Sequence, residues 1–173
     1  MPKKYLLFFP TAFLVVALDQ LTKSYVTAGM LLHESSTVVE GFLNITYVRN
    51  PGAAFGFLTH ASPMLRFVFF MAITVLAVGL ILYYVVKSEE EEPRLIIALA
   101  LILGGALGNL IDRLRFGEVV DFIDVYFKTY HWPAFNIADS AISIGAFFML
   151  LEMFNRRKRN KGEECRREAG FNI

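Results

Sequence analysis

The sequence has little cysteine, histidine and charge. Cys165 is the single cysteine among 173 residues, so no disulfide can form within the chain. The three histidines, at positions 33, 60 and 131, are scattered and form no metal-ligand pattern with it. Charged residues make up 19% of the chain and the net charge is +1, so the total charge points to no class of partner. We expect no metal, no cofactor and no nucleic-acid binding.

Hydrophobic residues, by contrast, make up 55% of the chain, and the mean hydropathy is +0.49. This is too apolar for an ordinary soluble domain and indicates a membrane protein. A bilayer core of about 30 Å requires about 20 helical residues. Four stretches meet or approach that requirement: 5–26, 67–86, 95–111 and 135–154. The third is short but contains "LGGALG", which would let neighbouring helices approach closely.

The first apolar run has two interpretations. "MPKK" followed by apolar residues is also typical of a signal peptide, with "TAG" at 27–29 as a weak cleavage candidate. However, "DQLTK" at 19–23 interrupts the run where a signal peptide stays apolar, and three more spans follow. We therefore expect a retained helix.

The distribution of Lys and Arg predicts the orientation. If both termini face the cytoplasm, that side carries eleven basic residues and the other side six. We expect a bacterial inner-membrane protein with a four-helix domain at 1–155 and a basic cytoplasmic tail at 156–173. The outer segments are then 27–66 and 112–134. Within the first, "LNITYV" predicts a strand, and the small apolar "AAFGFL" after it suits close packing or the membrane surface.

Polar residues gather near the outer ends of the spans, and ionisable groups there suggest a function. Two carboxylates from separate segments, Asp121 and Asp139, could meet where the last span enters the bilayer, Asp139 lying about one turn inside it. A close pair would share one proton, so that one member acts as a base toward water and the other as an acid toward a carbonyl. That is peptide hydrolysis without a metal. Ser140 and Ser143 have no neighbouring base, which argues against a serine hydrolase.

Several of these polar residues also have a purely structural interpretation. Asp19 and Lys23 stand four residues apart and can neutralise each other. Asn136 or Asp139 can cap the last helix. Asp112 or Asp121 could pair with Arg113 or Arg115. Asp124 could be a solvated or structural carboxylate.

Two other functional classes fit buried carboxylates. A small transporter or proton-coupled channel is one, but such folds show repeats and sites near the bilayer midplane, whereas this sequence has no internal repeat. A membrane scaffold is the other, with the glycine-rich span as its assembly surface. It predicts that Asp→Asn changes at 121 and 139 are harmless.

Four motifs in order resemble lipoprotein signal peptidase, also called signal peptidase II, a family of bacterial membrane aspartic peptidases. They are "DQLTK" at 19–23, "NPGAAFGFL" at 50–58, "GNLIDRLRFGEVVDFIDVYF" at 108–127 and "PAFNIADSAISIG" at 133–145. The resemblance covers about residues 5 to 154. Pro51 stands where the family often has another residue after Asn50.

This resemblance implies an activity and its residues. The family removes signal peptides from prolipoproteins just before a diacylglyceryl-modified cysteine. Asp121 and Asp139 match the catalytic aspartates, and Asn50 and Arg113 match residues that hold the substrate backbone and the peptide antibiotic globomycin. Further motif positions around the site are Asp19, Gly108, Asn109, Asn136 and Ala138.

The resemblance also implies a fold. We expect an all-α membrane protein of four transmembrane helices, with a small extracytoplasmic β-cradle and a periplasmic loop containing a helix. The active site would lie near the outer leaflet. The expected partners are lipidated prolipoproteins and membrane lipid, and nothing in the sequence demands more than a monomer.

Overall fold

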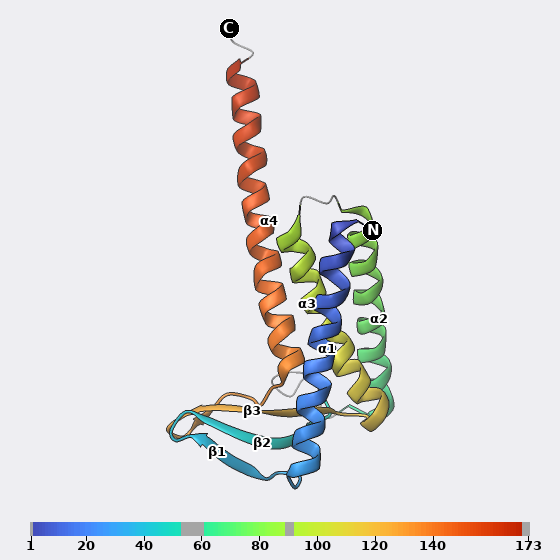
Figure 1. Cartoon of the computed structure of the whole chain (residues 1–173), viewed down its shortest axis with the longest axis vertical. Helices are drawn as coiled ribbons and strands as arrows, with labels where there is room; N and C mark the ends of the chain where they lie inside the picture. Colours follow the sequence, from blue (N-terminus) through green and yellow to red (C-terminus); the bar gives the residue numbers. More distant parts are fainter. Residues whose placement is uncertain (1, 53–60, 89–91, 171–173) are drawn as a thin grey trace.

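The computed structural model describes residues 2–52, 61–88 and 92–170, with side chains described as far as residue 155. The chain alternates long helices with strands that form one small sheet (Figure 1). The helices are α1 (Lys3–Gly29), α2 (Pro63–Lys87), α3 (Pro93–Phe116) and α4 (Ile137–Gly170). The strands are β1 (Ser35–Val39), β2 (Leu43–Asn50), β3 (Val119–Phe127) and β4 (Tyr130–His131).

All four helices are long and apolar enough to cross a membrane, which confirms the four predicted spans. The third was predicted to end at residue 111 but continues to Phe116. Gly117 ends it with a left-handed backbone (φ 76°), and its N–H donates to the Arg113 carbonyl, a common helix C-terminus. The fourth was predicted from residue 135 but begins at Ile137, and its helix continues beyond the other three to Gly170 (Figure 1).

Helix α3 is the centre of the bundle because its glycines admit neighbouring backbones. A side chain at Gly104 would collide with Val15 of α1, and one at Gly105 would collide with Ala138 of α4. Gly108 faces the Asp19 carboxylate, which also leaves no room for a Cβ. The prediction that "LGGALG" allows close helix packing is therefore confirmed. Helix α2 makes its main contacts with α3 alone and stands at the edge of the bundle.

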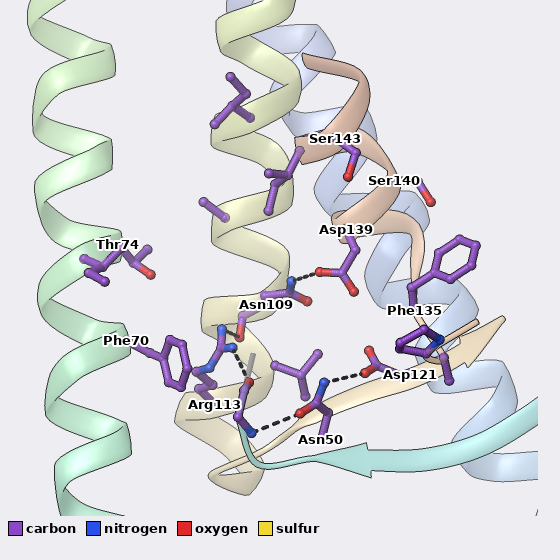
Figure 2. Close-up of a pocket in the computed structure, with 18 of the residues that line it drawn as sticks. Asn50, Phe70, Thr74, Asn109, Arg113, Asp121, Phe135, Asp139, Ser140 and Ser143 are labelled. Atoms are coloured by element: carbon purple, nitrogen blue, oxygen red, sulfur yellow. Dashed lines mark hydrogen bonds between the residues drawn. The ribbon is translucent and has the colours of Figure 1, made fainter. Parts of the chain in front are cut away.

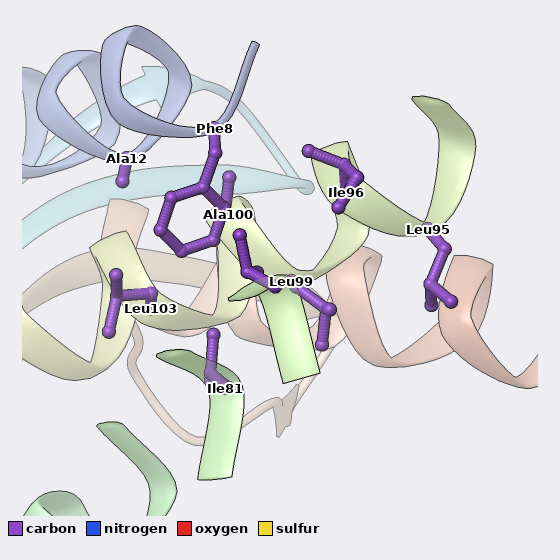
Figure 3. Close-up of a cluster of buried hydrophobic side chains, with 9 residues drawn as sticks. Phe8, Ala12, Ile81, Leu95, Ile96, Leu99, Ala100 and Leu103 are labelled. Atoms are coloured by element: carbon purple, nitrogen blue, oxygen red, sulfur yellow. The ribbon is translucent and has the colours of Figure 1, made fainter. Parts of the chain in front are cut away.

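The apolar core lies at the end of the bundle that is far from the sheet. It joins α1, α2 and α3 through Phe8, Ala12, Ile81, Val85, Leu95, Ile96, Leu99, Ala100 and Leu103 (Figure 3). Lys4 is buried beside it and donates to the carbonyls of Val86 (3.0 Å) and Ser88 (2.7 Å). The lysine thus satisfies carbonyls at the C-terminus of α2 that no helical N–H can reach.

The sheet crosses the opposite end of the bundle (Figure 1). Its strand order is β1-β2-β3-β4, all antiparallel, and β2 confirms the strand predicted from "LNITYV". A second cluster fixes the sheet to α1, formed by Val26, Tyr47, Val120 and Phe122. This contact decides where β3 presents its side chains to the helices.

The all-α part of the expected fold is not confirmed, because the four-stranded sheet is a layer of its own. Among the described residues of both outer segments, no separate helix is present. The apolar stretch "AAFGFL" at 53–58 and His60 lie outside the described residues.

Candidate active site

A cavity of about 1000 Å³ opens between α2, α3 and α4 and reaches the ends of β2 and β3 (Figure 2). Five of the nine residues singled out from the sequence line it: Asn50, Asn109, Arg113, Asp121 and Asp139. The other four lie behind this lining, and these are Asp19, Gly108, Asn136 and Ala138. The apolar part of the wall comes from all three helices.

Asp121 enters the cavity from β3 and is almost completely buried, with 2% exposed. One carboxylate oxygen accepts from the Asn50 amide at 2.9 Å and the other from the Asn136 amide at 2.7 Å. Burial and the neighbouring charge of Asp139 raise the pKa of Asp121, the two amide hydrogen bonds lower it, and the net pKa is about 7. A large fraction of Asp121 therefore holds a proton near neutral pH.

Asp139 reaches the same cavity from the first turn of α4 (Figure 2). It was predicted one turn inside the span, but the later start of α4 places it at the helix N-terminus, where the helix dipole favours a negative charge. Its Oδ1 accepts from the Asn109 amide at 2.8 Å. The helix cap is Asn136, whose Oδ1 accepts from the Asp139 N–H at 2.9 Å, so the alternative of Asp139 as the cap is wrong.

Two buried amides connect the carboxylates. Asn136 donates to Asp121 and also to the Asn109 Oδ1 at 3.3 Å, while Asn109 donates to Asp139. Both amide oxygens and nitrogens are used, so neither side chain can rotate without losing partners. The amides thus hold two carboxylates from different elements on one cavity wall.

A buried ion cluster supports this pair from behind. Lys23 lies 2.8 Å from both Asp19 and Asp112 and donates to the Asn109 Oδ1 at 2.9 Å. The predicted pair of Asp19 and Lys23 is therefore confirmed. Asp112 bonds to Lys23, Gln20 and the Val120 N–H, so the alternative in which it pairs with Arg113 or Arg115 is wrong.

Asp19 has a second function that its sequence position does not indicate. Its Oδ1 accepts the N–H of Ala138, 119 residues away, at 2.9 Å. This N–H belongs to the first turn of α4, where backbone donors have no helical partner. Asp19 therefore connects α1 to the first turn of α4, which also carries Asp139.

Arg113 closes one side of the cavity. Its guanidinium carbon lies 4.2 Å from the centre of the Phe70 ring of α2, and it donates to the Gly52 carbonyl at 3.3 Å. Gly52 in turn donates to the Asn50 Oδ1 at 3.0 Å, which forms a tight turn after β2. Arg113 thus joins α2, α3 and this turn around the cavity.

Sequence reasoning missed several residues that line or support the site. Phe70 and Thr74 of α2 and Trp132 line the cavity, and Gln20 bridges Asp19 and Asp112. Phe70 and Thr74 sit in an uninterrupted apolar run, so no local signal distinguishes them from lipid-facing residues. Trp132 lies just before α4, where an aromatic residue is equally typical of a membrane interface.

Two other candidates have structural contacts: Asp124 lies outside the cavity, whereas Ser140 lies on its wall. Asp124 accepts from Asn44 and pairs with His131 at 2.9 Å, which gives it a structural function on the sheet. Ser140 donates to the Asn136 carbonyl at 2.9 Å, as serines within helices commonly do. Within the described residues, no three His, Cys, Asp or Glu side chains are grouped as metal ligands.

Comparison with known proteins gives consistent matches along most of the chain. Residues 11–155 match the family model described as signal peptidase (SPase) II. A lipoprotein signal peptidase of Syntrophus aciditrophicus is 56% identical over 158 residues, which covers 91% of this chain and 98% of that protein. One from Geobacter sulfurreducens is 49% identical over 144 residues, covering 83% and 89%.

Solved structures resemble the fold as well. A bacterial membrane enzyme determined by the in meso method at 2.3 Å is 37% identical, with a TM-score of 0.78, covering 86% of this chain and 88% of that one. Another, determined at 1.9 Å, is 39% identical with a TM-score of 0.73, covering 83% and 89%.

Proposed function

Because the chain belongs to the signal peptidase II family and is a multi-pass membrane protein, we propose that it is an aspartic endopeptidase. On this proposal, Asp121 and Asp139 hydrolyse the bond that precedes the diacylglyceryl-modified cysteine of a prolipoprotein. One observation carries it: two carboxylates from β3 and α4 enter the same cavity, each fixed by a carboxamide. The scaffold alternative gives no reason for a cavity of this kind.

The proposed reaction uses one water and one shared proton. Asp139, as carboxylate, removes a proton from the water, whose oxygen forms a bond to the scissile carbonyl carbon. Asp121, whose pKa is raised to about 7, gives its proton to the carbonyl oxygen. The tetrahedral intermediate then loses its C–N bond: the proton held by Asp139 passes to the departing amine, and one hydroxyl of the intermediate returns its proton to Asp121 as the new carboxyl group forms. Atoms and charge balance without a metal or a covalent intermediate.

The walls of the cavity suit a lipidated peptide. Its apolar surface comes from α2, α3 and α4, and α2 stands at the bundle edge. Two acyl chains anchor such a substrate in the outer leaflet, so its scissile bond lies at the interface. Asp121 belongs to β3 and Asp139 to the end of α4 that is next to the sheet, and on this proposal that end of the bundle lies at the interface. Asn50 and Arg113, at the mouth, would hold the peptide backbone.

The remaining expectations form part of the same proposal. The catalytic domain is 1–155, followed by the basic tail at 156–173, and both termini face the cytoplasm of a bacterial inner membrane. Asp121 and Asp139 then lie toward the outer leaflet. The protein acts as a monomer, and globomycin occupies the substrate cavity.

The direct test is cleavage of a purified diacylglyceryl-modified prolipoprotein by the protein in lipid nanodiscs. Mass spectrometry of the products should find a fragment that begins with the lipidated cysteine. The same prolipoprotein without the diacylglyceryl group should remain uncut, and globomycin should block the reaction. Cleavage at another bond, or equal cleavage of the unlipidated form, would contradict the proposed specificity.

The pKa of Asp121 predicts the pH dependence of cleavage. The pair needs one proton, and Asp121 releases it as the pH rises through about 7. We therefore expect kcat/KM to be high below pH 7 and to fall about tenfold for each pH unit well above it. A pH–rate profile in nanodiscs measures this, and a flat profile between pH 6 and 9 would contradict it.

A matched variant identifies the group that titrates. The Asn50 amide donates to the Asp121 carboxylate and lowers its pKa. Asn50→Ala removes this bond, so the midpoint of the falling limb should move to higher pH, whatever the loss in rate. Asn44→Ala, which removes an amide that bonds Asp124 instead, should leave the midpoint unchanged.

A further inference from the structure

Two arginines outside the cavity meet at one aromatic ring. Arg49 belongs to β2, where alternation along the strand directs it away from the face that carries Asn50. Its guanidinium carbon lies 4.4 Å from the centre of the Phe116 ring. Arg115, in the last turn of α3, has its guanidinium carbon 5.1 Å from the same centre. Two cations from different elements therefore converge at the end of a membrane-spanning helix.

Neither arginine is neutralised by a carboxylate in the part of the chain that the structure describes. Among the described residues, no carboxylate lies within ion-pair distance of either guanidinium group. Arg49 uses its Nε to donate to the Tyr47 hydroxyl at 3.0 Å, which leaves its terminal amino groups for another acceptor. The nearby Asp112 already accepts from Gln20, Lys23 and a backbone N–H.

A small polar notch adjoins the pair. Its volume is about 30 Å³, and its walls come from α1, α3 and β3. The residues that line it are Gln20, Lys23, Ser24, Thr27, Asp112, Arg115, Phe116 and Val120. A space of this size accepts a water molecule or one small polar group. Ser24 and Thr27 of α1 thus line the notch together with Arg115, and the notch shares no lining residue with the candidate active site.

The surroundings are apolar on the side of the spans. Leu21 lies three residues before Ser24 on the same helix face and is 68% exposed, and Leu114 is 59% exposed beside Arg115. Both belong to helices that cross the membrane. A ligand here would meet two guanidinium groups at the helix ends and an apolar surface beneath them.

We propose that Arg49 and Arg115, held together against the Phe116 ring, bind the phosphate of an anionic phospholipid head group. Guanidinium groups bind phosphate oxygens in bidentate geometry, and they suit such contacts better than ammonium groups. The lipid explains the position of the site, since head-group phosphates lie where α1 and α3 leave the hydrocarbon. It also explains the apolar flank, which continues directly into the lipid-facing surface of the spans.

The test is the retention of lipid by the full-length protein. The protein is placed in nanodiscs of equal parts phosphatidylcholine and phosphatidylglycerol, and native mass spectrometry measures which lipids leave with it. The wild type should retain phosphatidylglycerol preferentially. Arg49→Gln and Arg115→Gln should each lower that preference about fivefold, the factor that corresponds to one basic residue at an anionic surface.

Lys128→Gln is the matched control, because Lys128 is an exposed cation of the sheet that lies outside this site. It should change the preference less than twofold. An equal effect of all three variants would indicate general attraction to negative charge and overturn the proposal. Arg115 is exposed, so Arg115→Gln decides the matter even if Arg49→Gln fails to fold.

A second arm separates the lipid from free phosphate. In nanodiscs of phosphatidylcholine alone, inorganic phosphate or glycerol 3-phosphate is added and the thermal midpoint is measured. The proposal expects no stabilisation by these ions and a stabilisation by phosphatidylglycerol that Arg115→Gln abolishes. Equal stabilisation by inorganic phosphate would show an ion site and overturn the assignment to lipid.

Discussion

Asp121→Asn and Asp139→Asn are each expected to lower cleavage of the lipidated prolipoprotein by about 10² to 10⁴-fold, the usual contribution of a positioned acid or base. Each change keeps the shape of the side chain and removes its proton exchange. Asp121→Asn leaves no acid for the carbonyl oxygen, and Asp139→Asn leaves no base for the water. Single-turnover cleavage in nanodiscs measures the loss at the chemical step.

The double variant gives a sharper result than either single variant. If the carboxylates act as one unit, removing both should cost little more than removing one, because the effects of such groups are not additive. Independent losses that multiply would indicate two separate functions. Asp124→Asn is the matched control on the same strand, since Asp124 bonds to Asn44 and His131 outside the cavity, and it should retain normal turnover.

Folding must be intact for these results to bear on mechanism. Both carboxylate oxygens of Asp121 accept amide hydrogen bonds, and the NH₂ group of an asparagine can accept neither, so Asp121→Asn loses one of these buried bonds. We expect this loss to cost about 1–3 kcal/mol of stability and to leave the variant folded, with a modestly lower thermal midpoint. Near-normal turnover in either variant would make that aspartate a structural residue and leave the dyad proposal without support.

Asp19→Leu is expected to lower the free energy of unfolding by about 3–5 kcal/mol, the cost of removing one partner of a buried ion pair. Asp19 is completely buried, with Lys23 at 2.8 Å and the Ala138 N–H at 2.9 Å. A leucine leaves the N–H of α4 without an acceptor and Lys23 with one carboxylate fewer. Reversible unfolding in mixed detergent micelles measures the change.

Asp19→Asn separates the two contributions. Its amide oxygen can still accept the Ala138 N–H, whereas the charge opposite Lys23 is lost, so its effect should lie between wild type and Asp19→Leu. The control is Glu40→Gln, because Glu40 is exposed on the sheet and its change should stay within about 0.5 kcal/mol. An Asp19→Leu effect no larger than this control would contradict a structural function for Asp19.

The resemblance in the sequence led to Asp19 as a residue around the site, and the structure specifies how it acts. It does not line the cavity; it holds the first turn of α4, from which Asp139 projects. Its replacement should therefore cost much stability as well as activity, whereas Asp121→Asn should remove activity with a smaller loss of stability. This contrast distinguishes a positioning residue from a catalytic one.

The four spans were determined by the sequence itself. Transfer of a segment from water to lipid depends on the apolarity of about 20 consecutive residues, which is a local property. Strand β2 could be predicted for a similar reason, since β-branched and aromatic residues favour a pleated, half-buried surface. The helix ends were less certain: α3 runs five residues past its predicted end, because charged Arg113 and Arg115 lie beyond the apolar run and yet remain helical.

The candidate carboxylates were also found from the sequence, since an ionisable group at the edge of an apolar run is costly and therefore conspicuous. The functions expected of Asn50 and Arg113 came from the family motifs and not from local physics. The sequence left open whether Asn136 or Asp139 caps α4, and nothing local indicated that Asn136 also bonds Asp121, or that the Arg113 guanidinium lies against Phe70.

Tertiary structure alone decided those contacts, because they join elements that are far apart in the chain. The glycines of α3 set how closely α1 and α4 approach, and that distance lets Asp19 reach Ala138. The contact of the sheet with α1 fixes the position of Asp121 relative to α4. The sequence by itself determines which segments enter the membrane; the packing of those segments determines which polar side chains meet, since each such contact depends on the relative placement of two elements.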